Sequence, residues 1–148
     1  MTFALELDIA ETPTAVFDFV ADFATTPQWY SAVQRVERVR GTGGIGTQYD
    51  IYRNLPTGPA VNLVHVTSYL AGREVTFTSV SGPTPFQYRY RIQPRGSETR
   101  LQLEGTISAQ GLPGIAAAFA PLAERLFKRG MHDNLRTLAA ILERKSPH

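Results

Sequence analysis

The strongest constraint on the fold comes from the middle of the chain, where segments typical of β-strands follow one another with only short turns between them. No helical pattern interrupts the region between Gln34 and Gln110. Strands at this spacing, without helices between them, imply an antiparallel sheet. The predicted strands are residues 34–40, 46–53, 60–69, 73–81, 86–93 and 98–109, and turns rich in Gly, Pro, Asn and Ser separate them.

The segment before this region predicts one more strand and two short helices. Apolar residues alternate with polar or small ones over residues 2–9, which is the period of a half-buried strand. Thr12 is suited to cap a helix whose first residue is Pro13. Pro27 interrupts the helical stretch that follows, so we expect two short helices and not one longer helix.

A long helix is predicted to close the chain, from near Pro113 to Glu143. Its apolar residues form two stripes that are offset by roughly a third of a turn, and the change falls near Gly130. The two halves of the helix are therefore expected to bury against different surroundings. The first stripe contains Ile115, Phe119, Leu122 and Leu126, and the second contains Met131, Leu135, Leu138 and Leu142.

The composition excludes several classes of protein. A chain of 148 residues with 43% apolar and 19% charged residues is typical of one globular domain, here residues 1–148. A formal net charge of only +2 gives no basis for a nucleic-acid partner. The sequence has no cysteine, which excludes disulfides, thiolate zinc sites and cysteine nucleophiles. Because neither a secretory signal nor an apolar run long enough to span a bilayer is visible, we expect a cytoplasmic protein without a membrane span.

Residues 41–46, GTGGIG, match the G-x-G-x-x-G pattern of dinucleotide-binding folds. That pattern acts as a phosphate site only where a strand precedes it and a helix follows it. Here the strand-like sequence TQYDIY follows, and residues 61–70 contain no Asp or Glu that could hold a ribose. The pattern therefore predicts a hairpin turn in which Gly41, Gly43 and Gly46 take positive φ angles, and no cofactor is expected.

The order of one strand, two short helices, six strands and a long helix resembles the helix-grip fold of the START-like (SRPBCC) superfamily. The resemblance covers essentially the whole chain and rests on ETPTAVFDFVADF, TTPQWYSAV, GTGGIGTQYDIY, VNLVHVTSYLAGREVTF and NLRTLAAILE. The sequence is most similar to the polyketide cyclase/dehydratase-like and lipid-transport-like branch. The resemblance implies an α+β fold, in which a curved antiparallel sheet of about seven strands grips the C-terminal helix around an apolar pocket for a small hydrophobic ligand.

Alternation along the strands assigns a set of side chains to the concave face of this sheet. The hydroxyls of Tyr49, Tyr88 and Tyr90 can meet a ligand carbonyl or hydroxyl, or reach solvent at the rim. Arg53 can meet a ligand carboxylate or enolate, or turn into water. The alternative is that the same side chains simply fill the core. The predicted ligand-binding residues are Tyr49, Ile51, Arg53, Val64, Val66, Phe77, Tyr88, Tyr90, Leu101, Leu103, Phe119, Leu122 and Leu126.

Three functions are compatible with this pattern. The first is binding of a small hydrophobic molecule, such as a lipid or polyketide, by a monomer or homodimer. The second is a cyclase or dehydratase, in which the tyrosines or Arg53 orient the substrate or polarise its carbonyl. The third is a module that binds a partner through the terminal helix. No Asp, Glu or His points inward by alternation, which favours binding over catalysis, and the histidines lack metal-ligand spacing, so no metal is expected.

Overall fold

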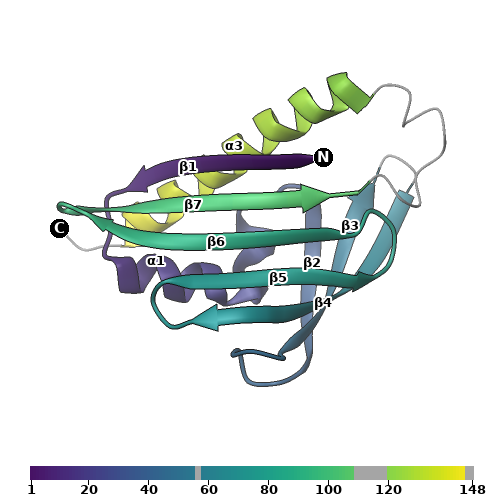
Figure 1. The fold of residues 1–148 in the computed structure, drawn as a ribbon, viewed down its shortest axis with the longest axis horizontal. Helices are drawn as coiled ribbons and strands as arrows, with labels where there is room; N and C mark the ends of the chain where they lie inside the picture. The colour runs from purple at the N-terminus through teal and green to yellow at the C-terminus, as the bar shows by residue number, and fades with distance from the viewer. Residues whose placement is uncertain (56–57, 109–119, 146–148) are drawn as a thin grey trace.

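The computed structural model describes residues 1–55, 58–108 and 120–145, without the side chains of residues 120–123 and 145. Within these residues, seven antiparallel strands form one curved sheet in the order β1-β7-β6-β5-β4-β3-β2 (Figure 1). The expected helix-grip architecture is confirmed, and each predicted strand is present with its ends moved by only a few residues. The strands are β1 (Thr2–Ile9), β2 (Val33–Arg40), β3 (Gln48–Leu55), β4 (Gly58–Leu70), β5 (Glu74–Ser81), β6 (Phe86–Arg95) and β7 (Glu98–Ile107).

Two short helices follow β1, as the sequence predicts. The first, α1 (Pro13–Ala21), begins where expected, because the side-chain oxygen of Thr12 accepts a hydrogen bond from the Ala15 N–H at 3.2 Å. The second is a 3₁₀ helix, η1 (Phe23–Gln28), which is capped by Asp22 and contains Pro27. Pro27 therefore lies inside the second helix instead of separating two helices.

The long helix α3 (Ala120–Lys145) crosses behind β1, β7 and β6, and α1 lies on the same face of the sheet (Figure 1). The second apolar stripe of this helix is confirmed as its buried face, since Met131, Leu135, Leu138 and Leu142 are all at most 5% exposed. The first stripe is different. Leu126 is 61% exposed and does not line the interior, while Phe119 and the side chain of Leu122 lie outside the described residues.

The position of Leu126 has a geometric explanation. The first turns of α3 extend past the edge of the sheet formed by β1 (Figure 1). At this level the neighbouring Phe127 makes the contact with the sheet, because its ring meets that of Phe3 at 5.2 Å. A helix that touches the sheet through one residue turns the next residue away by about 100°, so Leu126 faces outward.

The glycine-rich segment forms the turn between β2 and β3. Gly41, Gly43 and Gly46 have φ angles of 91°, 113° and 83°, as predicted. The Gly43 N–H donates to Thr47 Oγ1 at 2.9 Å, which ties the turn to the start of β3. A strand follows these glycines, so the helix N-terminus that a dinucleotide phosphate requires is not supplied by this turn.

Gly105 of β7 allows the aromatic core to close over the sheet. It pairs with Phe3 of β1 and Tyr88 of β6, and the Phe3 ring lies directly over its α-carbon. A Cβ at this position would overlap that ring. Phe3 has little freedom to move away because it packs edge-on against Tyr88 at 5.9 Å and against Phe127.

We therefore predict opposite effects for the same substitution at two glycines. Gly105→Ala should lower the free energy of unfolding by about 1–3 kcal/mol, because it overpacks the Phe3 site. Gly130→Ala should raise it by about 0.5–1 kcal/mol, because Gly130 lies inside α3 and nothing lies within 4 Å of its added Cβ. Urea denaturation measures both, and a Gly105→Ala protein as stable as the wild type would contradict this packing.

Candidate functional site

The most unusual polar group of the inner face is the guanidinium of Arg53, on β3. The side chain is only 4% exposed. Its Nη2 donates hydrogen bonds to Asn62 Oδ1 at 2.7 Å, to the Pro83 carbonyl oxygen at 2.7 Å and to Thr84 Oγ1 at 2.6 Å. The charged carbon Cζ lies 5.3 Å from the centre of the Phe86 ring. The Arg53 side chain points to the inner face of the sheet, as alternation along the strand predicts. It is buried there, so the alternative in which it turns into water does not hold.

The surroundings of Arg53 compensate its charge only partly. The oxygens that accept its hydrogen bonds belong to an amide, a hydroxyl and a carbonyl, and all are neutral. In the described part of the chain its Nε is buried without a hydrogen-bond partner. Burial lowers the pKa of Arg53, since desolvation disfavours the charged form.

Two tyrosine hydroxyls meet near this guanidinium. Tyr30, which follows η1, and Tyr88 of β6 place their hydroxyl oxygens 3.1 Å apart, and both side chains are at most 7% exposed. Burial is the main reason that the pKa of each phenol is raised, and it also raises the pKa of the neighbouring Tyr90. These phenols are therefore neutral hydrogen-bond donors and acceptors at physiological pH.

Six of the predicted residues form the apolar part of the same face. Ile51, Val64, Val66, Phe77, Leu101 and Leu103 are all at most 2% exposed. Tyr49 is also buried, but it lies four residues before Arg53 on β3 and stacks on Phe23 at 5.3 Å, away from the Tyr30–Tyr88 pair. The structure therefore brings Arg53 and Tyr88 together and separates Tyr49 from them.

Sequence reasoning missed three residues of this cluster. Asn62 is fully buried, and its Nδ2 donates to Ser79 Oγ at 3.0 Å and to the Pro83 carbonyl oxygen at 2.8 Å. Its position two residues before Val64 on β4 marks it as inward-facing, and a polar residue there was the available signal. Tyr30 and Thr84 lie outside regular strands, where alternation makes no prediction.

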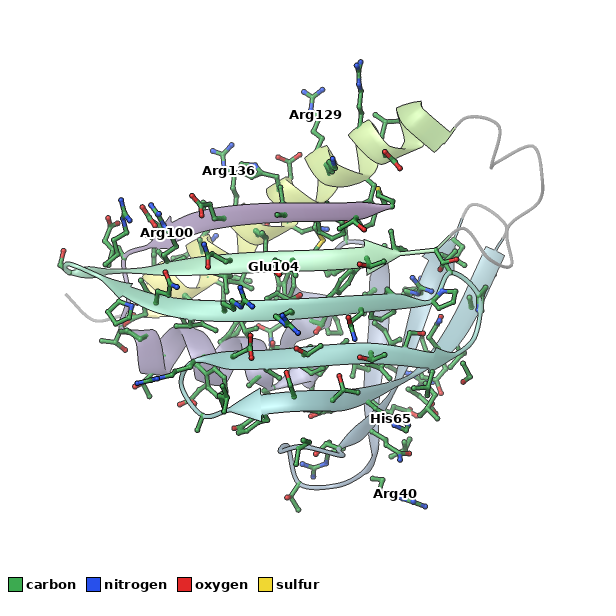
Figure 2. All side chains as sticks on the ribbon, in the orientation of Figure 1. Arg40, His65, Arg100, Glu104, Arg129 and Arg136 are labelled. Carbon is green, nitrogen blue, oxygen red and sulfur yellow. The ribbon has the colours of Figure 1, made fainter. Side chains whose placement is uncertain are left out.

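The outer face of the sheet carries charges of both signs in alternation. Arg91 forms ion pairs with Glu74 at 3.0 Å and with Glu104 at 2.9 Å, and Arg100 pairs with Asp8 at 2.9 Å. Arg100 and Glu104 lie on the side of β7 that faces the viewer in Figure 2. This arrangement makes the outer face a mixed face and not a single-sign patch.

Among the described residues, no group of three or more His, Cys, Asp or Glu is placed to hold a metal ion. Within the same residues, no helix has the length and apolar character needed to cross a membrane. The buried polar residues of the described chain are Thr26, Thr47, Arg53, Asn62, Thr76, Ser79, Thr84 and Thr99, so they include neither a carboxylate nor an imidazole.

The fold and the aromatic inner face define a helix-grip protein of the START-like class. Comparison with known proteins agrees with this class and specifies the family: the chain belongs to the polyketide cyclase / dehydrase and lipid transport family, whose sequence profile matches residues 2–143. No curated protein matches the sequence significantly.

Solved structures of low sequence identity share the fold over nearly their whole length. The protein TTHA0849 from Thermus thermophilus is 17% identical, with a TM-score of 0.84 over 99% of this chain and 100% of that one. A START superfamily protein from Mycobacterium smegmatis is 16% identical, with a TM-score of 0.80 over 98% and 99% of the two chains. The Zhui aromatase/cyclase from Streptomyces sp. R1128 is 12% identical, with a TM-score of 0.80 over 98% and 94%.

The hydroxyl pair provides a test of the local geometry. Tyr30→Phe and Tyr88→Phe should each lower the free energy of unfolding by about 1–2 kcal/mol, because each leaves the other buried hydroxyl without its partner. The loss of unfolding free energy in the double variant should be smaller than the sum of the two single losses. The difference, which is the coupling energy of the double-mutant cycle, should be about 1 kcal/mol. Tyr52→Phe serves as the control, since its hydroxyl bonds to Glu37 on the exposed surface. Strict additivity of the two losses would contradict the contact.

Proposed function

We propose that this protein binds a small hydrophobic molecule that carries an electron-rich oxygen, between the inner face of the sheet and α3. Arg53 and the Tyr30–Tyr88 pair are its polar contacts, and the aromatic side chains around them hold its apolar part. The observation that carries this proposal is the buried guanidinium of Arg53, whose hydrogen-bond acceptors are neutral.

The energetics of the guanidinium support the presence of a ligand oxygen. Removing an ion from water costs several kcal/mol, and neutral acceptors recover only part of that cost. A carboxylate, an enolate or a polarised carbonyl oxygen would add the charge-assisted hydrogen bond that Arg53 Nε does not make within the described residues. The bound form would then stabilise a charge that is expensive in the free protein.

The surroundings suit an aromatic or polycyclic ligand. The Phe86 ring stacks on Tyr88 at 4.7 Å, and Tyr88 in turn contacts Phe3 edge-on. Phe3 connects this group to Phe127 of α3. Rings in such positions favour ligands with flat apolar surfaces, because offset and edge-on contacts add to the gain from burial. The lipid transport and cyclase functions in the family's description, and the aromatase/cyclase of similar fold, agree with this ligand class.

A cyclase or dehydratase that acts on a polyketide-like substrate is the second candidate, and the same cluster favours it. Arg53 would stabilise an enolate oxygen, and the Tyr30–Tyr88 pair would donate a proton to a leaving hydroxyl. Such a reaction also needs a base. Since the fully buried residues of the described chain include no carboxylate and no histidine, binding without chemistry is the simpler function.

Native mass spectrometry of the freshly purified protein tests whether a ligand is retained. We expect a mass excess over the sequence mass that disappears when the same sample is denatured. The released molecule should contain an aromatic or polycyclic body and at least one carbonyl, carboxyl or hydroxyl oxygen. A retained molecule without any oxygen would contradict the assigned role of Arg53.

A matched pair of probes tests that role directly. We predict that 2-naphthoate binds more tightly than its neutral analogue 2-naphthamide. Arg53→Gln should lower the affinity for 2-naphthoate about tenfold and change the affinity for 2-naphthamide little. Isothermal titration calorimetry measures both. Arg136→Gln is the control, because it makes the same charge change on the outward side of α3 (Figure 2). Equal losses in the two variants, or no binding of either probe, would contradict the proposal.

A further inference from the structure

A second buried donor without a partner lies on the inner side of the sheet, away from Arg53. Trp29, the C-cap residue of η1, is only 4% exposed, and within the described residues its Nε1 has no hydrogen-bond partner. We propose that Trp29 Nε1 donates a hydrogen bond to a second oxygen of the ligand, which therefore carries an acceptor oxygen at each end of a flat body. This inference rests on the proposed function and adds the length and the second polar group of the ligand.

Three inward side chains of β6 place Trp29 relative to Arg53. Phe86 lies beside the guanidinium of Arg53, with its ring centre 5.3 Å from Cζ. Two residues further along lies Tyr88 of the hydroxyl pair. Two residues further again, Tyr90 meets the Trp29 ring edge-on at 6.4 Å. The two unpartnered donors therefore belong to opposite ends of one row of side chains, and the hydroxyl pair lies between them.

The length of this row sets the length of the ligand. Phe86 and Tyr90 are four residues apart, which corresponds to roughly 13 Å along a strand. A hydrogen bond of about 3 Å at each end leaves about 7 Å or more between the two acceptor oxygens, a distance that about two or three fused rings span.

The unpaired indole N–H is not explained by packing. Buried indole N–H groups usually find a partner, and one that finds none keeps the full cost of leaving water. A phenylalanine could pack on Tyr30 and Tyr90, which the Trp29 ring contacts, without this cost. The one other unpartnered buried atom of the described chain besides Arg53 Nε, Nε2 of His65, belongs to the opposite face, because both neighbours of His65 on β4 point inward.

The two ends of the row select different oxygens. The guanidinium of Arg53 is charged and favours a carboxylate or an enolate. The indole of Trp29 is neutral and can only donate, so it suits a ketone, ether or hydroxyl oxygen and rejects an ammonium group. The ligand class is therefore a flat polycyclic acid or enol with a neutral oxygen at its far end.

The test uses the indole N–H itself, because the chain contains a single tryptophan and gives a single indole signal in the NMR spectrum of ¹⁵N-labelled protein. The probes are 6-acetyl-2-naphthoate and 6-isopropenyl-2-naphthoate, which have the same shape, but only the first has an acceptor oxygen at the far end. We expect a downfield shift of the indole proton with the acetyl probe alone, and about fivefold tighter binding of that probe by calorimetry. Equal affinities, or an indole proton that moves alike with both probes, would overturn the assignment.

Variants separate this inference from the proposed function. In Trp29→Phe the two probes should bind with equal affinity. Arg53→Gln should weaken both about tenfold and keep the fivefold preference, and Tyr52→Phe, an aromatic substitution on the outer surface, should change neither value. A preference that survives in Trp29→Phe would refute the role of Trp29 and leave that of Arg53 standing. Failure of both probes to bind the wild type would refute both roles. The indole signal of the wild type tests the same contact even if Trp29→Phe does not fold.

Discussion

The apolar inner face of the sheet must be covered, and this requirement governs the rest of the structure. Nearly every strand contributes fully buried side chains to that face, and each such side chain is worth about 1.5–3 kcal/mol only when water is excluded from it. In the described residues, α1, η1 and α3 provide the cover (Figure 1). Because three helical segments cannot follow the curvature of the sheet closely, large aromatic side chains complete the packing.

Phe3, Phe23 and Trp29 show how the aromatic side chains complete this packing. Phe3 bridges the sheet to α3, and Phe23 bridges it to η1 through contacts with Tyr49 and Phe77 at 5.3 and 4.3 Å. Trp29 meets Tyr90 edge-on at 6.4 Å. Rings reach farther from the backbone than aliphatic groups, which lets short helices seal a wide sheet. The tyrosines among them bring hydroxyl groups into the interior, so the same aromatic side chains that fill the core also supply polar contacts.

The Arg53 cluster is the exception to an apolar interior, and the backbone beside it is correspondingly strained. Thr84, whose hydroxyl accepts from Arg53, has a φ of 47°, an angle that a residue with a branched side chain rarely adopts. A buried cation and a strained turn each cost free energy that simple packing would avoid. Both costs fall at one place in the interior, and that place is the site proposed for the ligand.

The sequence predicted the strands, the inward side of β3 to β7 and the buried stripe of α3, because these depend on local periodicity alone. Leu126 was assigned wrongly, since its stripe gives the face of the helix but not how far the helix extends beyond the sheet. The Tyr30–Tyr88 pair joins residues 58 positions apart, and no local pattern records such a contact.

Tyr49 and Arg53 show most clearly where alternation stops being informative. Both point inward from β3, and the sequence placed both in one ligand site. Four residues along a strand correspond to roughly 13 Å, which is enough to separate two environments. At one end the Tyr49 ring completes the aromatic core, and its environment includes the charges of Asp22 and Arg38. At the other end Arg53 is enclosed by neutral oxygens and the Phe86 ring. The same parity therefore leads into two different environments, and only the tertiary contacts of each residue distinguish them.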